Sequence, residues 1–268
     1  MDINEKVETL AKWINQSNNI VAFTGAGVST ESGLPDFRSP DGLYNLGTNN
    51  PVSTESGIPD FRSVDGLYNQ QYDYPPETIL SHTFYEARPE EFFRFYRNKM
   101  LFPDAQPNAA HKKLAELEAA GKLTAVVTQN IDGLHQKAGS KNVLELHGSV
   151  LRNYCEKCGK FFSLEDIMAS SGVPRCDKCG GRVKPDVVLY EEALDQQVLS
   201  AALEAIRKAD MLIIGGTSLA VYPAASLVNY YRGNRLALIN KSPTPYDRNA
   251  DLVIAAPIGQ VLGGITVR

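Results

Sequence analysis

The sequence predicts an α/β protein whose doubly wound parallel sheet is interrupted by a smaller zinc-binding module. Short apolar runs alternate with segments of helical periodicity along most of the 268 residues. A glycine turn, Gly25-Ala26-Gly27, directly follows the first of these runs, and two Cys-x-x-Cys pairs interrupt the alternation further along the chain. Strands of a parallel sheet read as continuous apolar runs because helices cover both faces, so this pattern favours a doubly wound sheet.

The strands are expected at six apolar runs: Ile20–Phe23, Leu123–Thr128, Val143–Leu146, Met211–Ile214, Leu236–Ile239 and Leu252–Ala256. Apolar residues recur every three or four positions over Val7–Ile14, Ala109–Ala120 and Asp195–Ala209, which predicts amphipathic helices. A further helical insert, dense in Phe and Tyr, is expected over Glu77–Leu101. Strands that alternate with helices in this way are typical of a parallel sheet.

Composition and charge exclude several classes of protein. The 43% of hydrophobic and 22% of charged residues are typical of a globular chain and argue against disorder. A net charge of −4 offers no basic surface for nucleic acid and disfavours anionic membranes. The apolar runs are too short to span a bilayer, and Met1–Trp13 contains no signal-peptide core. We therefore expect a cytoplasmic protein that binds neither nucleic acid nor membrane.

The four cysteines form two pairs, Cys155 with Cys158 and Cys176 with Cys179, separated by 17 residues. A disulfide framework would need a secreted protein, and a redox Cys-x-x-Cys usually occurs only once. The doubled spacing is typical of a four-cysteine zinc ribbon. Four thiolates leave zinc no open coordination position, so we expect one structural ion per chain and a catalytic site elsewhere.

A repeat distinguishes this chain from a simple α/β domain. Val28–Asn45 recurs as Val52–Asn69, with 16 of 18 positions identical. Two copies are too few for a solenoid, so a local duplication is the simplest account. Asn49-Asn50-Pro51 precedes the second copy where Gly25-Ala26-Gly27 precedes the first. Only the first copy therefore continues from a strand through a glycine turn.

The glycine turn is a candidate phosphate site. Gly25-Ala26-Gly27 lets the backbone turn tightly and approach a phosphate, with a helix N-terminus expected behind it. Thr30 replaces the third glycine of the usual dinucleotide fingerprint, and no acidic residue ends a following strand to hold a ribose. An ordinary NAD dehydrogenase is therefore disfavoured.

Polar residues also follow later strands, at the edge where α/β sheets bind ligands. Thr128–Asp132 either caps the next helix or holds a carboxamide and ribose hydroxyls. His147 is either structural or catalytic, and its position near that loop favours catalysis. Gly215–Ser218 repeats the strand and glycine turn, and Asn240–Ser242 offers side chains suited to ribose hydroxyls. His82, His111 and His135 are interpreted as structural.

Motifs along nearly the whole chain resemble those of the sirtuins, and in particular those of bacterial NAD-dependent protein deacetylases. GAGVSTESGLPDFR, TQNIDGLH, LHG, the paired Cys-x-x-Cys, GTSL and INKS occur in the order typical of that family. The resemblance implies a discontinuous Rossmann-like NAD-binding domain over 1–45, 103–151 and 185–268. It also implies a small domain formed by the helical insert 70–102 and the zinc module 152–184, with 46–69 as the duplicated loop.

The resemblance further implies NAD-dependent removal of acetyl or other small acyl groups from lysines of protein or peptide substrates. The products would be nicotinamide, O-acetyl-ADP-ribose and free lysine. His147 would be the general base, and Asn130 would be catalytic by holding the nicotinamide and its ribose in the reactive pose. The residues implied to bind NAD are Gly25, Ala26, Gly27, Thr30, Ser32, Phe37, Arg38, Gln129, Asn130, Ile131, Asp132, Gly216, Thr217, Ser218, Asn240, Lys241 and Ile258.

The repeat leaves one assignment open. Phe37 and Arg38 follow the glycine turn, whereas Phe61 and Arg62 are continuous with the helical insert, and we favour the first pair. If the duplicated loop blocks the cleft, the chain would instead be a non-catalytic NAD- and zinc-binding interaction module. A mono-ADP-ribosyltransferase is the alternative enzyme, because it would share the NAD site and use another nucleophile.

Two further positions bear on the substrate. Phe93 and Tyr96 stand where the desuccinylating branch of the family carries Tyr and Arg, so a small neutral acyl group is favoured. Glu191 replaces a glycine that is usual in the peptide-pairing segment of the family, so the preference for peptides is expected to differ.

Overall fold

The computed structural model describes residues 2–38, 42–43 and 72–267. The chain divides into two compact units. Unit 1 comprises Met1–Leu34, Pro103–Ser149 and Ala193–Arg268, and unit 2 comprises Pro35–Phe102 and Val150–Glu192. Each unit is described by itself.

Unit 1 is built on a parallel sheet, which confirms the predicted fold class. Its strands are β1 (Ile20–Thr24), β2 (Leu123–Thr128), β3 (Val143–Glu145), β7 (Met211–Gly215), β8 (Leu236–Ile239) and β9 (Leu252–Ile254). Among the described residues these six strands run in the order β3-β2-β1-β7-β8-β9. The order reverses between β1 and β7, and in open α/β sheets ligands bind at the carboxyl ends of the strands at such a point.

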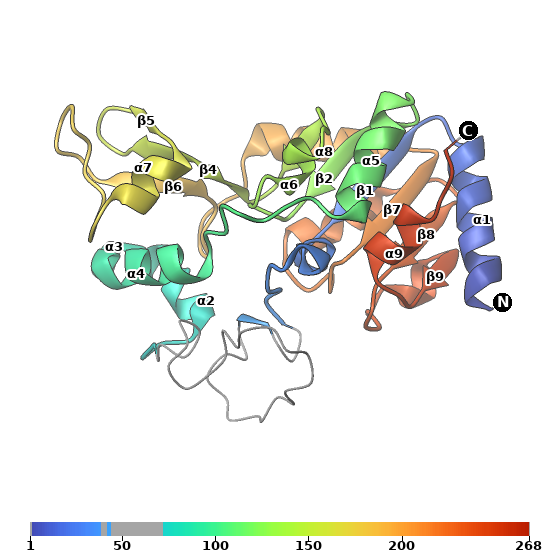
Figure 1. Cartoon of the computed structure of the whole chain (residues 1–268), viewed down its shortest axis with the longest axis horizontal. Helices are drawn as coiled ribbons and strands as arrows, with labels where there is room; N and C mark the ends of the chain where they lie inside the picture. Colours follow the sequence, from blue (N-terminus) through green and yellow to red (C-terminus); the bar gives the residue numbers. More distant parts are fainter. Residues whose placement is uncertain (1, 39–41, 44–71, 268) are drawn as a thin grey trace. The chain divides into compact units, whose positions relative to one another are not determined.

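Helices cover both faces of this sheet (Figure 1). The helices α1 (Ile3–Gln16), α5 (Ala109–Ala119) and α9 (Ile258–Gly263) share one apolar cluster with one face of the strands. The other face is covered by α8 (Gln196–Lys208), which contacts β2, β3 and the 3-10 segment η5 (Ala224–Tyr230). Every residue of β1, β7 and β8 is buried, which explains why these strands are apolar at each position.

Side-chain caps fix the starts of these helices. Asp2 and Glu5 form a capping box at α1, and Asp195 accepts from two backbone amides at the start of α8. Asn108 caps α5 in the same way and hydrogen-bonds reciprocally with His111.

The segment after the glycine turn differs from the expectation of an α-helix. Two 3-10 turns are found there, η1 (Ala26–Val28) and η2 (Thr30–Ser32). The Val28 carbonyl accepts from Asn108 Nδ2 at 2.7 Å, while the Ser32 amide donates to the Ser29 carbonyl. In an α-helix the Val28 carbonyl would accept from the Ser32 amide. Here it accepts from the Asn108 side chain instead, and the Ser32 amide bonds one residue nearer, so 3-10 turns form in place of an α-helix.

Unit 2 combines helices with a small sheet. Its elements are α2 (Pro76–Ile79), α3 (His82–Ala87), α4 (Pro89–Lys99), β4 (Gly148–Cys155, in unit 2 from Val150 on), β5 (Phe161–Phe162), α7 (Leu164–Ala169) and β6 (Val183–Val187). The predicted helical insert is thus three helices, two of which begin with a proline at the first position. The sheet order is β5-β4-β6, and Tyr85, Phe92, Phe93 and Tyr96 form an aromatic core.

Among the helices of the described residues, none has the length and apolar character that a membrane span requires.

The short elements that complete unit 1 are α6 (Leu134–Lys137) and η6 (Asp247–Asn249).

Candidate functional site

The glycine turn lies against the loop that follows β7. The Gly27 amide donates to the Gly216 carbonyl at 2.7 Å, and the Gly25 amide donates to the Gly215 carbonyl at 3.3 Å. A Cβ on Gly27 would lie 2.9 Å from the Gly216 Cα, and a Cβ on Gly216 would lie 2.2 Å from the Val28 amide nitrogen. Gly216 also has a φ of +60°. The glycines therefore let two loops pack backbone to backbone at the point where the strand order reverses.

A buried hydrogen-bond network sits directly beyond this turn. Ser29 Oγ donates to Asp132 Oδ2 at 2.6 Å and accepts from Asn130 Nδ2 at 3.0 Å. The second carboxylate oxygen of Asp132 accepts from the Leu134 amide at 2.8 Å. Asp132 therefore both supports the helix that follows and orients the Ser29 hydroxyl at the sheet edge. The expected contact of this loop with a carboxamide and ribose hydroxyls stays a prediction.

Two buried histidines lie behind the network. The His111 and His135 rings are 4.7 Å apart between centroids, and His111 Nε2 lies 3.5 Å from Ser29 Oγ. Thr24 Oγ1 donates to Thr128 Oγ1, so it accepts from His135 Nε2 at 3.1 Å. Burial lowers the pKa of His111 to about 4, although Asp132 opposes the shift. Burial and the neighbouring His111 lower the pKa of His135 to about 3. Both rings are therefore neutral at pH 7.

His147 occupies the turn between β3 and β4. Its Nδ1 lies 3.0 Å from the Gln129 carbonyl oxygen, which can only accept, so Nδ1 carries the proton and Nε2 carries the free lone pair. Burial lowers the pKa of His147, and the hydrogen bond to Gln129 opposes that shift. A neutral imidazole with a fixed tautomer is the form that a general base requires.

Several other predicted residues of unit 1 lie in the segments that follow neighbouring strands. Gln129 Nε2 donates to Thr217 Oγ1 at 3.1 Å, and Asn240 Nδ2 donates to the Thr217 carbonyl at 3.0 Å. Thr30 Oγ1 donates to the Gly27 carbonyl at 3.0 Å. Ser218 and Lys241 are exposed at this edge.

Three further predicted residues, Ile258, Phe37 and Arg38, lie outside the segments of the site described so far. Ile258 is buried at the start of α9, where its side chain fills the space beside Gly215, so that a Cβ there would lie 2.0 Å from Ile258 Cδ1. Phe37 and Arg38 belong to unit 2, and their role in binding stays a prediction. The competing pair Phe61 and Arg62 lies outside the described residues.

Sequence reasoning missed two members of the network. Ser29 lies in the glycine turn motif, but its hydroxyl is not distinguished there from those of Thr30 and Ser32. His111 was interpreted as structural, yet its ring reaches the Ser29 hydroxyl across 82 positions of sequence. A hydroxyl residue two positions after the glycine turn is the local signal that could have indicated Ser29.

The four cysteines of unit 2 meet as predicted. Their Sγ atoms all lie within 4.8 Å of one another, with 3.4 Å between Cys155 and Cys179 and 3.7 Å between Cys158 and Cys176. A tetrahedral zinc with Zn–S bonds of about 2.3 Å needs S···S separations of about 3.8 Å. The four cysteines therefore fit one zinc ion. They would occupy all four of its ligand positions and leave none for water or substrate, which supports a structural role.

The residues that the sequence analysis relates to the substrate lie in unit 2. Phe93 and Tyr96 are buried in the aromatic core, and burial raises the pKa of Tyr96 above its usual range. Glu191 has a φ of +75°, in the region that favours glycine. Its carboxylate accepts from the Thr83 amide at 2.9 Å and from the Thr83 hydroxyl at 2.7 Å. These two bonds offset the strain of a glutamate at a position suited to glycine.

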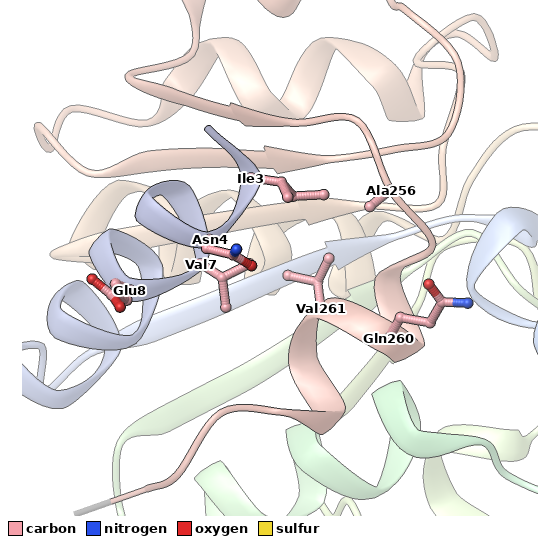
Figure 2. A pocket seen from close by; sticks show the side chains of 7 residues that line it. All are labelled: Ile3, Asn4, Val7, Glu8, Ala256, Gln260 and Val261. Carbon is pink, nitrogen blue, oxygen red and sulfur yellow. The ribbon is translucent and has the colours of Figure 1, made fainter. Parts of the chain in front are cut away.

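One surface pocket lies apart from these groups. Figure 2 shows it between α1 and α9, lined by Ile3, Asn4, Val7, Glu8, Ala256, Gln260 and Val261. None of the predicted site residues lines this pocket, so it is not the candidate site.

The strand order, the glycine turn at its reversal and the polar groups along the carboxyl edge define an α/β protein with a nucleotide-type site. The sequence pattern of the Sir2 family matches residues 25–51 and 49–223. The chain therefore belongs to the Sir2 family, the sirtuins.

Relatives and solved structures agree with this assignment. The chain is 56% identical over 259 residues to an NAD-dependent protein deacetylase of Clostridium acetobutylicum, covering 96% of this chain and 97% of that one. It is 44% identical over 248 residues to one of Staphylococcus aureus, covering 92% and 93%. A structure described as Sir2 with a p53 peptide and NAD+ matches with a TM-score of 0.77 and 36% identity, covering 98% of this chain and 96% of that one.

Proposed function

We propose that this protein removes acetyl groups from protein lysines in an NAD-dependent reaction. The products are nicotinamide, O-acetyl-ADP-ribose and the free lysine. The observation that carries the proposal is His147, a neutral imidazole whose Nδ1–H is fixed on the Gln129 carbonyl and whose Nε2 is available as a base. The deacetylase names of the bacterial relatives support the same activity.

The carboxyl edge of the sheet suits NAD. The glycine turn brings backbone close to a phosphate group, and the hydroxyls of Thr30 and Thr217 lie beside it. Asn130 and Asp132 offer amide and carboxylate groups suited to a carboxamide and ribose hydroxyls. When bound, NAD supplies a ribose carbon that becomes electrophilic as nicotinamide leaves, which the weakly nucleophilic acyl oxygen requires.

Hydrogen bonds within the protein hold the polar groups around Ser29 in place. The Ser29 hydroxyl holds the side chains of Asn130 and Asp132 together, and all three belong to unit 1. Polar groups fixed in advance need no reorganisation during the reaction, which is how positioning and electrostatics lower a barrier. Catalysis in this site thus rests on orientation together with one base.

His147 takes the proton that the reaction must release from a ribose hydroxyl. Its lowered pKa, caused by burial, favours the form in which Nε2 is unprotonated and can accept that proton. A zinc ion held by the four cysteines would contribute no step, because thiolates would occupy all four of its ligand positions.

The substrates proposed are proteins and peptides that carry acetyl-lysine. One solved structure, described as a Sir2 variant with a deacetylated p53 peptide and 3'-O-acetyl ADP-ribose, supports this class, with 36% identity to this chain and a TM-score of 0.79. Buried Phe93 and Tyr96 add no cation for an acidic acyl group, which favours small neutral acyl chains. A cytoplasmic location stays a prediction, supported by a cysteine set suited to zinc rather than to disulfides.

One assay tests the proposed function against its alternatives. The purified protein is incubated with an acetyl-lysine peptide, with and without NAD+, and both deacetylation and nicotinamide release are measured. NAD-dependent deacetylation with equimolar nicotinamide is the expected result. Transfer of ADP-ribose to protein without deacetylation would instead indicate a mono-ADP-ribosyltransferase. No turnover from folded, zinc-loaded protein would indicate a non-catalytic module.

A further inference from the structure

The duplicated segment poses a choice that sequence similarity alone leaves open. The Sir2 family pattern matches the chain in two segments, 25–51 and 49–223, which divide between the two copies. The second segment joins Val52–Asn69 to the downstream chain, as if the second copy were the working one. The two copies are identical at 16 of 18 positions, so each could in principle supply the serine of the site.

In the structure the first copy makes the contacts. Ser29 binds Asp132 and Asn130, as described above. Glu31 Oε1 accepts from the Gly259 amide at 2.8 Å, and Ser32 Oγ accepts from Asn108 Nδ2 at 3.0 Å. Val28 and Ser29 are almost completely buried.

These contacts do not explain why the first copy is selected. The second copy carries the same residue types at the matching positions, with Ser53, Glu55 and Ser56 in place of Ser29, Glu31 and Ser32. Every side-chain hydrogen bond of the first copy could therefore be made by the second. The choice must depend on residues outside the repeat.

The difference lies in the three residues before each copy. Gly27 donates its amide to Gly216, whereas the matching Pro51 has no amide proton to donate. A Cβ on Gly27 would also lie 2.9 Å from the Gly216 carbonyl oxygen. A Cβ on Gly25, matched by Asn49, would lie 2.7 Å from the Thr217 Cβ. The glycine turn is thus packed against the loop after β7. Positions 25 and 27 have no space for side chains such as those of Asn49 and Pro51.

We propose that only the first copy can occupy the site, because Asn49-Asn50-Pro51 bars the second copy from packing against the loop after β7. The first copy alone then supplies Ser29 to Asn130 and Asp132, and the second copy is dispensable for NAD binding. This inference rests on the proposed function only through the identity of the ligand, because the packing argument holds without it.

Two deletions of equal length test the proposal. Deleting residues 46–69 joins Asn45 to Gln70 and keeps the first copy behind Gly25-Ala26-Gly27. Deleting residues 25–48 joins Thr24 to Asn49 and keeps the second copy behind Asn49-Asn50-Pro51. Apart from those three residues, the two products differ only by Leu34 against Ile58 and Pro40 against Val64. A third variant adds Asn49→Gly, Asn50→Ala and Pro51→Gly to the 25–48 deletion.

The measurements are NAD+ affinity by calorimetry and the thermal unfolding midpoint. The 46–69 deletion should bind NAD+ within about threefold of the full chain, while the 25–48 deletion should bind at least about 100-fold more weakly, because it loses a buried hydrogen bond and gains a steric overlap. The third variant should recover both the affinity and the midpoint. Equal NAD+ affinity of the two simple deletions would overturn the proposal, and so would a third variant no better than the 25–48 deletion.

Point variants in the full chain give an independent test. Ser29→Ala should weaken NAD+ binding and lower the unfolding midpoint, whereas the matched control Ser53→Ala should change neither. Equal losses from the two variants would mean that both copies occupy the site. If the intact chain binds no NAD+, the proposed function fails, and the midpoints of the three deletion variants still decide which copy occupies the site.

Discussion

The buried histidine pair makes the stability of unit 1 sensitive to mild acid. His111 and His135 have exposed fractions of 0% and 1%, and burial holds their pKa values at about 4 and about 3. In the unfolded chain both would return to about 6.5. The folded pKa values are depressed, so the unfolded state binds more protons at intermediate pH. The stabilisation is therefore complete above pH 6.5 and is lost as the pH falls through the range between the unfolded and folded values.

The size of the effect follows from the linkage relation. Lowering the pH from 7 to 5 protonates both histidines when the chain is unfolded and neither when it is folded. Each pKa unit is worth about 1.4 kcal/mol, so each histidine costs about 2 kcal/mol of unfolding free energy over this step, and the pair costs about 4 kcal/mol. The calculated loss depends little on the exact pKa values of the two histidines in the folded protein, because both pKa values lie at or below about 4.

The test compares the wild type with a His111→Gln/His135→Gln double variant. Urea unfolding is followed at pH 7 and pH 5 by the fluorescence of Trp13, the single tryptophan, which belongs to unit 1. The wild type should lose about 4 kcal/mol more than the double variant between the two pH values. The double variant is expected to be less stable at pH 7, but only the change with pH enters the comparison. Equal changes in the two proteins would refute the reasoning, as would an NMR titration that shows either native ring protonated at pH 6.

The other predictions concern the base, the metal, the glycine turn and the arginine of the cofactor loop. His147→Ala should lower deacetylation by about 100- to 10,000-fold while NAD+ affinity stays within a few-fold, and wild-type turnover would remove the base assignment. Cys176→Ala should abolish zinc binding, measured by metal analysis, and unfold unit 2, measured by protease sensitivity; a zinc-free protein that stays folded and active would contradict a structural zinc. Gly27→Ala places a methyl group 2.9 Å from backbone atoms of the facing loop and should cost about 1–3 kcal/mol in urea unfolding, whereas an unchanged midpoint would show that the loops separate easily. Arg38→Ala should impair NAD-dependent turnover far more than Arg62→Ala, and the reverse order would assign the cofactor loop to the second copy.

The sequence by itself determined the features that depend on neighbouring residues. The predicted strands Leu123–Thr128 and Leu236–Ile239 have the bounds that the structure gives. Leu236–Ile239 is buried and apolar at every position, and Leu123–Thr128 is buried at all positions except Thr124, so both form short runs rich in apolar residues. The predicted helix over Asp195–Ala209 corresponds to α8 together with its two caps. The four cysteines of the expected zinc site could also be predicted from the sequence, because the short spacing within each Cys-x-x-Cys pair brings its two thiols together locally.

Only the tertiary structure decided how the site is assembled. The hydrogen bond from Ser29 to Asp132 spans 103 positions, and the contact between Gly27 and Gly216 joins loops after two different strands. No local pattern encodes such pairs, because they arise when parallel strands bring distant loops to one edge of the sheet. In our proposal the same contact also selects the first copy of the repeat. The two copies carry the same side chains at the contacting positions, so these side chains do not distinguish them. The packed loop after β7 leaves room only for glycine at positions 25 and 27, and this space is visible only in the tertiary structure.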